Sequence, residues 1–248
     1  GVGHLVLIDD GSRDATVQQI RDFLTQRRSQ GLLVPVTLLE LTRNFGKEAA
    51  MLAGLDYANG RCAAAVLIDS DLQHPPERIP AMVQAWRRGA EVVTAVRDDR
   101  DAEGLVKVAT ASWFYRMFNR LVDSIQLQEG AGDFRLLSAP VVEAFTQMRE
   151  ATRFSTGLMP WTGYRSEEIA YSRVARSGGS TSWSSLKLWR YALDGIFSFT
   201  VKPLKVWGVI GVLISLVSFV YATLIVLRTL VFGVDLPGYA SLIVAVLF

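Results

Sequence analysis

Short apolar runs alternate with amphipathic stretches from the start of the chain to about residue 175. Such runs, bounded by turn-forming residues, predict strands, whereas apolar residues at helical spacing predict helices. The alternation predicts an α/β domain whose mainly parallel sheet is covered by helices on both faces. The expected strands are 2–8, 36–41, 63–68 and 91–96, and the expected helices are one after Asp14, 48–57 and 76–87.

The C-terminal part of the sequence is apolar over a longer stretch. Val206–Leu227 contains 22 residues without a charge, and a helix of that length reaches about 33 Å, enough to cross a hydrocarbon core of about 30 Å. A turn with Gly233 and Gly238 follows, and the apolar stretch Tyr239–Phe248 is too short to span. We therefore expect 204–248 to be a transmembrane hairpin with an incomplete second helix, in a multi-pass protein that extends beyond both ends of this sequence.

Two stretches combine aromatic, apolar and basic residues at helical spacing, Val106–Val122 and Leu186–Phe199. Helices of this kind lie in the headgroup layer of membranes. The first stretch could equally pack against the domain core, whereas the second leads into the predicted span, so 176–203 is expected to be a juxtamembrane region. Basic residues before the span outnumber those after it, which predicts a cytosolic N-terminal domain. They are Lys187, Arg190, Lys202 and Lys205 before it, and Arg228 after it.

Composition narrows the class of protein. Among the 248 residues, 26 Lys and Arg oppose 24 Asp and Glu, and this net charge of +2 is too balanced for a nucleic-acid binder. The single Cys62 excludes a disulfide-stapled scaffold and fits a reducing compartment. Hydrophobic residues make up 50% of the chain, which excludes a disordered protein.

Polar residues directly after the expected strands are the first candidates for a site, because ligands of open α/β sheets bind beyond the carboxyl ends of the strands. Asp9 and Asp10 follow the first strand, Asp69 and Asp71 the third, and Arg97 the fourth. Two carboxylates one residue apart suit Mg²⁺ or Mn²⁺, which prefer oxygen ligands, but they also occur in turns that cap a helix. No Gly-x-Gly-x-x-Gly follows any expected strand, which disfavours a dinucleotide-binding fold, and no Walker-type Gly-Lys-Ser/Thr loop occurs.

Five motifs occur in a characteristic order along the chain. They are Asp9–Asp14, Arg43–Lys47, Asp69–Glu77, Gly132–Leu136 and Gly157–Trp161. With these motifs the sequence resembles family 2 glycosyltransferases of the GT-A fold. More narrowly, it resembles the polyisoprenyl-phosphate glycosyltransferases, which include bactoprenol glucosyltransferases and dolichol-phosphate mannose synthases. The resemblance includes the terminal hairpin but not the family's first strand, so it implies a catalytic domain at 1–175 that lacks that strand.

The resemblance implies a donor site for a UDP-sugar with Mg²⁺ or Mn²⁺. Asp9 and Asp10 would contact the uracil and the ribose. Asp69 would face the nucleotide and the metal, and Asp71 and Gln73 would coordinate the metal, which neutralises charge on the departing UDP. Gln73 could equally cap the helix that follows. The full expected set is Asp9, Asp10, Lys47, Asp69 and Arg97 for the nucleotide, Asp69, Asp71 and Gln73 for the metal, and Asp71 and Asp133 for catalysis.

On the acceptor side, the resemblance implies that Asp133 is a catalytic base or an orienting group. Because a phosphate acceptor is already ionised at neutral pH, Asp133 could instead mainly position Arg135 or the sugar, or hold its own loop. Two arginines beside a Gly/Ser loop can clamp a phosphate through guanidinium and backbone N–H groups. The expected lipid-phosphate ligands are Arg135, Arg173, Arg176, Ser177 and Ser180.

The resemblance thus implies an inverting hexosyltransferase at the cytosolic face of a bacterial inner membrane. We expect glucose to pass from UDP-glucose to a polyisoprenyl phosphate such as undecaprenyl phosphate. Aminoarabinose, galactose or GDP-mannose donors stay open, as does a homo-oligomeric state. A processive polysaccharide synthase is disfavoured because no Gln-x-x-Arg-Trp run occurs, and an inactive membrane scaffold is disfavoured by the intact Asp69, Asp71, Gln73 and Asp133.

Overall fold

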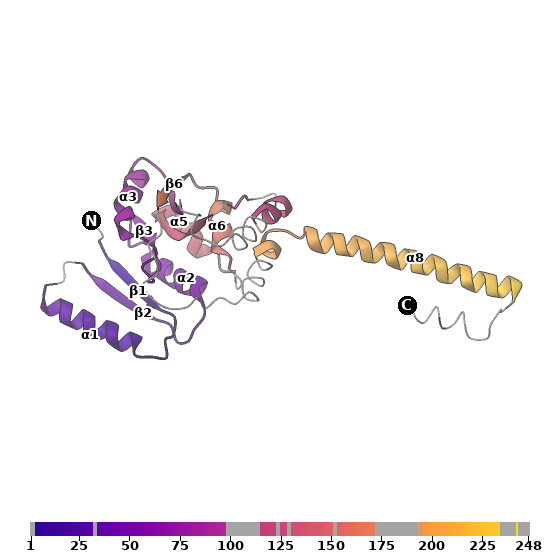
Figure 1. The fold of residues 1–248 in the computed structure, drawn as a ribbon, viewed down its shortest axis with the longest axis horizontal. Helices are drawn as coiled ribbons and strands as arrows, with labels where there is room; N and C mark the ends of the chain where they lie inside the picture. Colours follow the sequence, from indigo (N-terminus) through magenta and orange to yellow (C-terminus); the bar gives the residue numbers. More distant parts are fainter. Residues whose placement is uncertain are drawn as a thin grey trace. The chain divides into compact units, whose positions relative to one another are not determined.

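The computed structural model describes residues 3–31, 34–97, 115–122, 125–127, 130–150, 153–171, 193, 195–233 and 242. The chain divides into two compact units, Gly1–Phe199 and Thr200–Phe248 (Figure 1). In chain order the elements are β1 (Leu5–Asp9), α1 (Thr16–Ser29), β2 (Val36–Glu40), α2 (Lys47–Ala58), β3 (Ala64–Leu67), a 3₁₀ turn (Pro76–Arg78), α3 (Ile79–Arg87), β4 (Val92–Arg97), β5 (Ala131–Ser138), α5 (Ala139–Gln147), α6 (Ser155–Trp161), β6 (Ser166–Tyr171) and α8 (Lys202–Phe232).

The four strands expected in the first hundred residues are confirmed as β1, β2, β3 and β4, and the three expected helices as α1, α2 and α3. Strands β1 and β2 pair in parallel, with α1 between them in the chain. Asp14 accepts hydrogen bonds from the N–H and the hydroxyl of Thr16, the first residue of α1, in a turn before the helix, whose N-cap is Ala15. Helix α2 packs against both β1 and β3.

The second sheet is mixed, so the prediction of a mainly parallel sheet is wrong. Its strand order is β3-β5-β4-β6, in which β5 runs antiparallel to β3 and β4 while β4 and β6 are parallel. The error arose at β5, whose glycines and charged residues hide the alternation that identifies a strand. A residue run that looks like a polar loop motif is the central strand between β3 and β4.

Helices cover both faces of this sheet, as predicted. Successive side chains of β5 point to opposite faces, and the core follows that rule: Leu136 joins Met82 of α3 on one face, and Leu137 joins Leu55 of α2 and Phe145 of α5 on the other. Because Asp133 and Arg135 share the parity of Leu137, they belong to the face covered by α2, α5 and α6.

The described end of the expected amphipathic helix Val106–Val122 is helical over 115–121 and belongs to a third core cluster. Phe118 is fully buried and packs near Phe154 and Phe199, with ring centroids 5.9 and 6.4 Å away. For these residues, packing against the domain core is therefore the observed alternative. The rest of that stretch, and most of the Leu186–Phe199 stretch, lie outside the described residues.

The predicted span is a helix in the second unit. Helix α8 has 31 residues, which reach about 47 Å at 1.5 Å per residue. Within the part of the chain that the structure describes, α8 is the single helix that is long and apolar enough to cross a membrane, a property consistent with membrane association. Gly233, at φ +81°, ends it. The second helix of the predicted hairpin falls outside the described residues apart from Leu242.

Candidate active site

The loops after β1 and β2 are tied together by backbone contacts. The Asp10 carboxylate accepts hydrogen bonds from the N–H groups of Phe45 and Gly46, both at 2.8 Å. Gly11, at φ +68°, lies so close to the backbone that a Cβ there would be 2.3 Å from the carbonyl carbon of Arg43. Glycine is therefore required at position 11 both by its backbone conformation and by the lack of space.

A groove of about 380 Å³ opens beside these two loops. A volume of this order suits a small-molecule ligand. Asp9 lines the groove and also accepts hydrogen bonds from the N–H and the hydroxyl of Ser12. Asp10 is not among the lining residues, and its carboxylate is committed to the neighbouring loop. The lining residues are Asp9, Gly11, Ser12, Arg13, Val17, Glu40, Leu41, Thr42, Arg43 and Asn44.

A lysine joins two of the predicted carboxylates at the start of α2. The ammonium of Lys47 lies 2.8 Å from Asp69 Oδ2 and 2.7 Å from Asp133 Oδ2. Strand pairing accounts for this contact: Leu67, the last residue of β3, stands opposite Arg135 of the antiparallel strand β5, so Asp69 and Asp133 both lie just beyond this last pair. Burial lowers the pKa of Lys47, but attraction by Asp133 and Asp69 outweighs burial and leaves that pKa raised. The lysine is therefore charged at neutral pH.

The loop after Asp69 has a turn that holds the second carboxylate of the motif. Leu72 adopts φ +59°, which is uncommon for a residue with a side chain. The N–H of Gln73 donates to Asp71 Oδ1 at 3.1 Å, and the Gln73 side chain is buried. Strained backbone of this kind clusters at functional sites, so the turn is compatible with the predicted ligand role of Asp71.

His74 holds this loop through two contacts. Its ring stacks on Phe134 at a centroid distance of 5.1 Å, and its Nδ1 accepts the Asp69 N–H at 3.2 Å. Burial lowers the pKa of His74, although the nearby Asp69 charge pulls it upward. A neutral imidazole that accepts at Nδ1 carries its proton on Nε2. The His74 ring therefore holds the loop through its stacking on Phe134 and its hydrogen bond from the Asp69 N–H.

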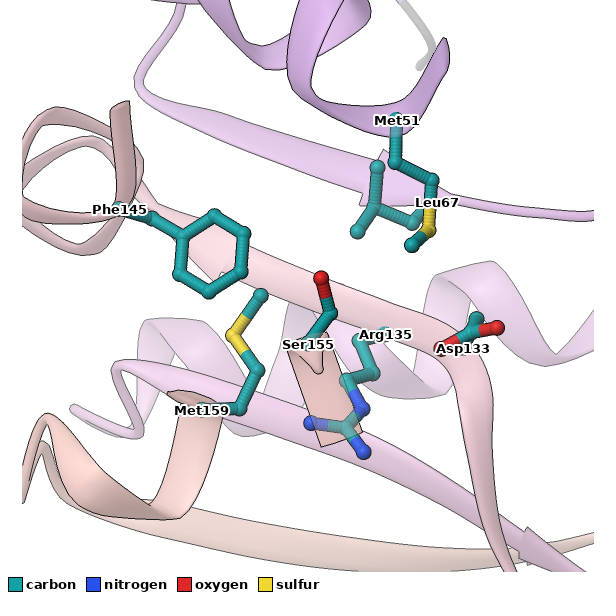
Figure 2. A pocket seen from close by; sticks show the side chains of 7 residues that line it. All are labelled: Met51, Leu67, Asp133, Arg135, Phe145, Ser155 and Met159. Atoms are coloured by element: carbon teal, nitrogen blue, oxygen red, sulfur yellow. The ribbon is translucent and has the colours of Figure 1, made fainter. Parts of the chain in front are cut away.

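Asp133 also lines a small cavity whose walls come from α2, β3, β5, α5 and α6 (Figure 2). Its volume is about 10 Å³, about the space of one water molecule. Arg135 lines it, is buried, and donates from Nε to the Gly132 carbonyl at 2.8 Å. An arginine so placed lies within the domain rather than on an open surface. The lining side chains are Met51, Leu67, Asp133, Arg135, Phe145, Ser155 and Met159.

The remaining predicted site residues have different outcomes. Arg97 ends β4 and is half-buried. Arg173, Arg176, Ser177 and Ser180 lie outside the described residues. Within the described ranges no group of three His, Cys, Asp or Glu side chains is arranged as a metal site.

Sequence reasoning overlooked Glu48 and Ser155, which are hydrogen-bonded to each other across 107 positions of the chain. No local sequence pattern predicts the contact between Glu48 and Ser155.

Comparison with known proteins places this arrangement in a family. The model of glycosyl transferase family 2 matches residues 4–145, which include Lys47, Asp69 and Asp133. The chain belongs to glycosyl transferase family 2. This confirms the predicted family and its GT-A fold, here with mixed strand pairing, and the protein is a transferase.

Relatives of the transferase match it over almost its whole length. It is 46% identical over 244 residues to an uncharacterized glycosyltransferase of Synechocystis sp., and this match covers 98% of the chain and 74% of the relative. It is 42% identical to a prophage bactoprenol glucosyl transferase homolog of Escherichia coli, with 98% of the chain and 77% of the relative covered. Its identity to the bactoprenol glucosyl transferase of Shigella phage SfV is also 42%, with 98% and 76% covered.

Proposed function

We propose that the protein transfers glucose from UDP-glucose to a polyprenyl phosphate, such as undecaprenyl phosphate, at the cytosolic face of a bacterial inner membrane. The observation that carries this proposal is the 42% identity, over 98% of the chain, to proteins named bactoprenol glucosyl transferase. The apolar helix α8 supports it, because a lipid-linked acceptor requires a site beside a membrane.

On the donor side, the groove beside Asp9 would take the nucleoside. Arg43 and Asn44 line this groove, and the same loop runs on into Lys47. A nucleotide with its base in the groove would therefore extend its phosphates toward the Lys47 ammonium. Asp10 would act indirectly, by fixing the backbone of Phe45 and Gly46 between groove and lysine. Arg97, at the end of β4, would be a further ligand of the nucleotide.

The donor set after β3 fits a divalent cation. Asp69 and Asp71 offer hard carboxylate oxygens, the ligands that Mg²⁺ and Mn²⁺ prefer, and Asp69 already faces one cation, the Lys47 ammonium. Asp69, Asp71 and Gln73 would hold the metal. When bound, it would neutralise the charge that develops on the departing diphosphate.

The reaction we propose is a single displacement with inversion. A phosphate oxygen of the acceptor forms a bond to the anomeric carbon, and the bond from that carbon to UDP breaks with its electron pair leaving on UDP. Since the acceptor phosphate is already ionised, proton removal is not demanded of Asp133. Its ion pair with Lys47 supports an orienting role, in which Asp133 holds the ammonium toward the diphosphate.

On the membrane side, we propose that 176–203 is juxtamembrane and that 204–248 is a hairpin carrying α8 as its first span, in a multi-pass chain. Lys202 and Lys205 at the start of α8 support a cytosolic catalytic domain at 1–175. The lipid phosphate would be held by Arg173, Arg176, Ser177 and Ser180, with Arg135 organising the cavity beside Asp133.

Transfer to undecaprenyl phosphate from a panel of radiolabelled sugar nucleotides tests this function. Full-length protein in detergent should label the lipid from UDP-glucose in preference to UDP-galactose, an aminoarabinose nucleotide or GDP-mannose. Preferential labelling from another donor would replace the sugar assignment and keep the reaction type. No labelled lipid from any donor would overturn the function and favour an inactive scaffold.

A further inference from the structure

The carboxylate of Glu48 joins the start of α2 to the start of α6. The Ser155 N–H donates to Glu48 Oε1 at 3.2 Å, and the Ser155 hydroxyl donates to Glu48 Oε2. Ser155 is 3% exposed, so little water competes for these bonds. Hydrogen bonds to an ionised acceptor are stronger than those between neutral groups.

The Glu48–Ser155 contact adjoins both Lys47 and the cavity that Asp133 lines. Glu48 follows Lys47 in the first turn of α2, and Lys47 pairs with Asp69 and Asp133. Ser155 lines the small cavity together with Asp133, and Figure 2 shows it between the apolar Phe145 and Met159 and the charged pair on β5. The Glu48 carboxylate thus connects the turn of α2 that carries Lys47 with Ser155, which lines the same cavity as Asp133.

We propose that Glu48 is a positioning residue, which fixes the first turn of α2 against α6 so that Lys47 reaches the diphosphate of the donor. The inference rests on the proposed function and assigns a residue outside the predicted site set. Without the Glu48 contact, Asp10 still holds the loop before α2 through the Gly46 N–H, but the first turn loses its hydrogen bonds to Ser155 at the start of α6. Small displacements of a positioned group are costly in such sites.

The fold itself does not depend on this contact. Leu55 of α2 packs with Leu158 and Met159 of α6 in a buried apolar cluster. That packing should keep the two helices together when the carboxylate is removed, so a Glu48→Ala protein should fold. A helix contact that only adds stability would therefore affect the melting temperature without changing ligand selectivity.

The test compares binding of UDP and of uridine, which lacks the phosphates, by ligand-observed NMR with full-length protein in detergent and Mn²⁺. Glu48→Ala should weaken UDP binding about tenfold and leave uridine binding unchanged. Ser155→Ala should weaken UDP binding in the same direction, and the double variant should be no weaker than Glu48→Ala, because both act through one contact. Glu48→Gln should recover part of the affinity, since its amide oxygen still accepts one hydrogen bond.

Asp56→Ala is the matched control. Asp56 lies on the same helix and pairs with Arg149 through two hydrogen bonds of 2.7 and 2.8 Å, but it is remote from Lys47 along α2. It should bind UDP and uridine like the wild type. Wild-type UDP affinity in Glu48→Ala, or an equal loss of UDP and uridine, would overturn the positioning role. A wild-type protein that binds UDP but transfers no sugar would overturn the proposed function alone.

Discussion

Lys47 Nζ lies 2.7 Å from Asp133 Oδ2, so a residue at the start of α2 and a residue of the central strand β5 form one charged unit. The same ammonium also contacts Asp69. It balances two carboxylates that would otherwise repel each other across the β3–β5 pair. The lysine therefore has a structural role in the free protein and, by our proposal, a second one toward the donor phosphates.

Replacing this lysine should affect transfer more than folding. Lys47→Met removes a preorganised positive charge, and we expect kcat/KM for UDP-glucose to fall about a hundredfold or more. Lys47→Arg keeps the charge in a planar, wider group and should recover only part of the loss. Steady-state transfer assays at several UDP-glucose concentrations measure both. Wild-type kcat/KM in Lys47→Met would contradict the donor-side role.

Removing the second carboxylate of the motif should abolish transfer while the protein stays folded. Asp71→Ala deletes a proposed metal ligand, and it also loses the hydrogen bond to the Gln73 N–H, which contributes about 1 kcal/mol. Lipid labelling and thermal unfolding should be measured in the same preparation, with Asp56→Ala as the folded and active reference. A fully active Asp71→Ala protein would remove Asp71 from the metal set.

Two glycine substitutions separate backbone strain from crowding. Gly11 and Gly31 both have positive φ, +68° and +79°, but only Gly11 has a neighbour where a Cβ would lie. Gly31→Ala should lower the free energy of unfolding by about 1–2 kcal/mol from strain alone. Gly11→Ala should lower it further and weaken uridine binding, because the loops beside the groove must separate. Equal losses in the two variants would show that the contact with Arg43 carries no energy.

Donor and metal should stabilise the protein together. A ligand at 100 times its Kd raises the unfolding free energy by about 2.7 kcal/mol, so UDP with Mn²⁺ should raise the melting temperature. UDP with a chelator should raise it less, because Asp69 and Asp71 would then face the diphosphate without a cation between them. Equal shifts with and without Mn²⁺ would argue against metal-assisted donor binding.

Local sequence patterns predicted the elements and site candidates that depend on interactions between residues close together in the chain. The length of the uncharged stretch identified α8, and the polar residues at the ends of β1 and β3 identified Asp9, Asp10, Asp69 and Asp71 as site candidates. Family resemblance supplied Lys47 and Asp133, which have no such local signal. Their contact with Asp69 required the antiparallel register of β3 and β5, which depends on pairing between distant segments.

The errors have the same physical origin. The β5 run has a glycine at Gly132 and charged residues at Asp133 and Arg135, which line the small cavity, so the apolar alternation of a buried strand is broken where the site is built. The Glu48–Ser155 contact joins segments 107 residues apart. Neither residue differs from an ordinary polar residue until the tertiary structure brings the two together.

The position of β5 also sets the order in which the molecule can be completed during synthesis. Strands β3 and β4 are not neighbours, and each pairs with β5. On the ribosome, neither can form its β5 ladder until Ser138 has been translated, and pairing over such separations is slow. The charged unit around Lys47 is therefore assembled late, after more than half of the domain exists as nascent chain.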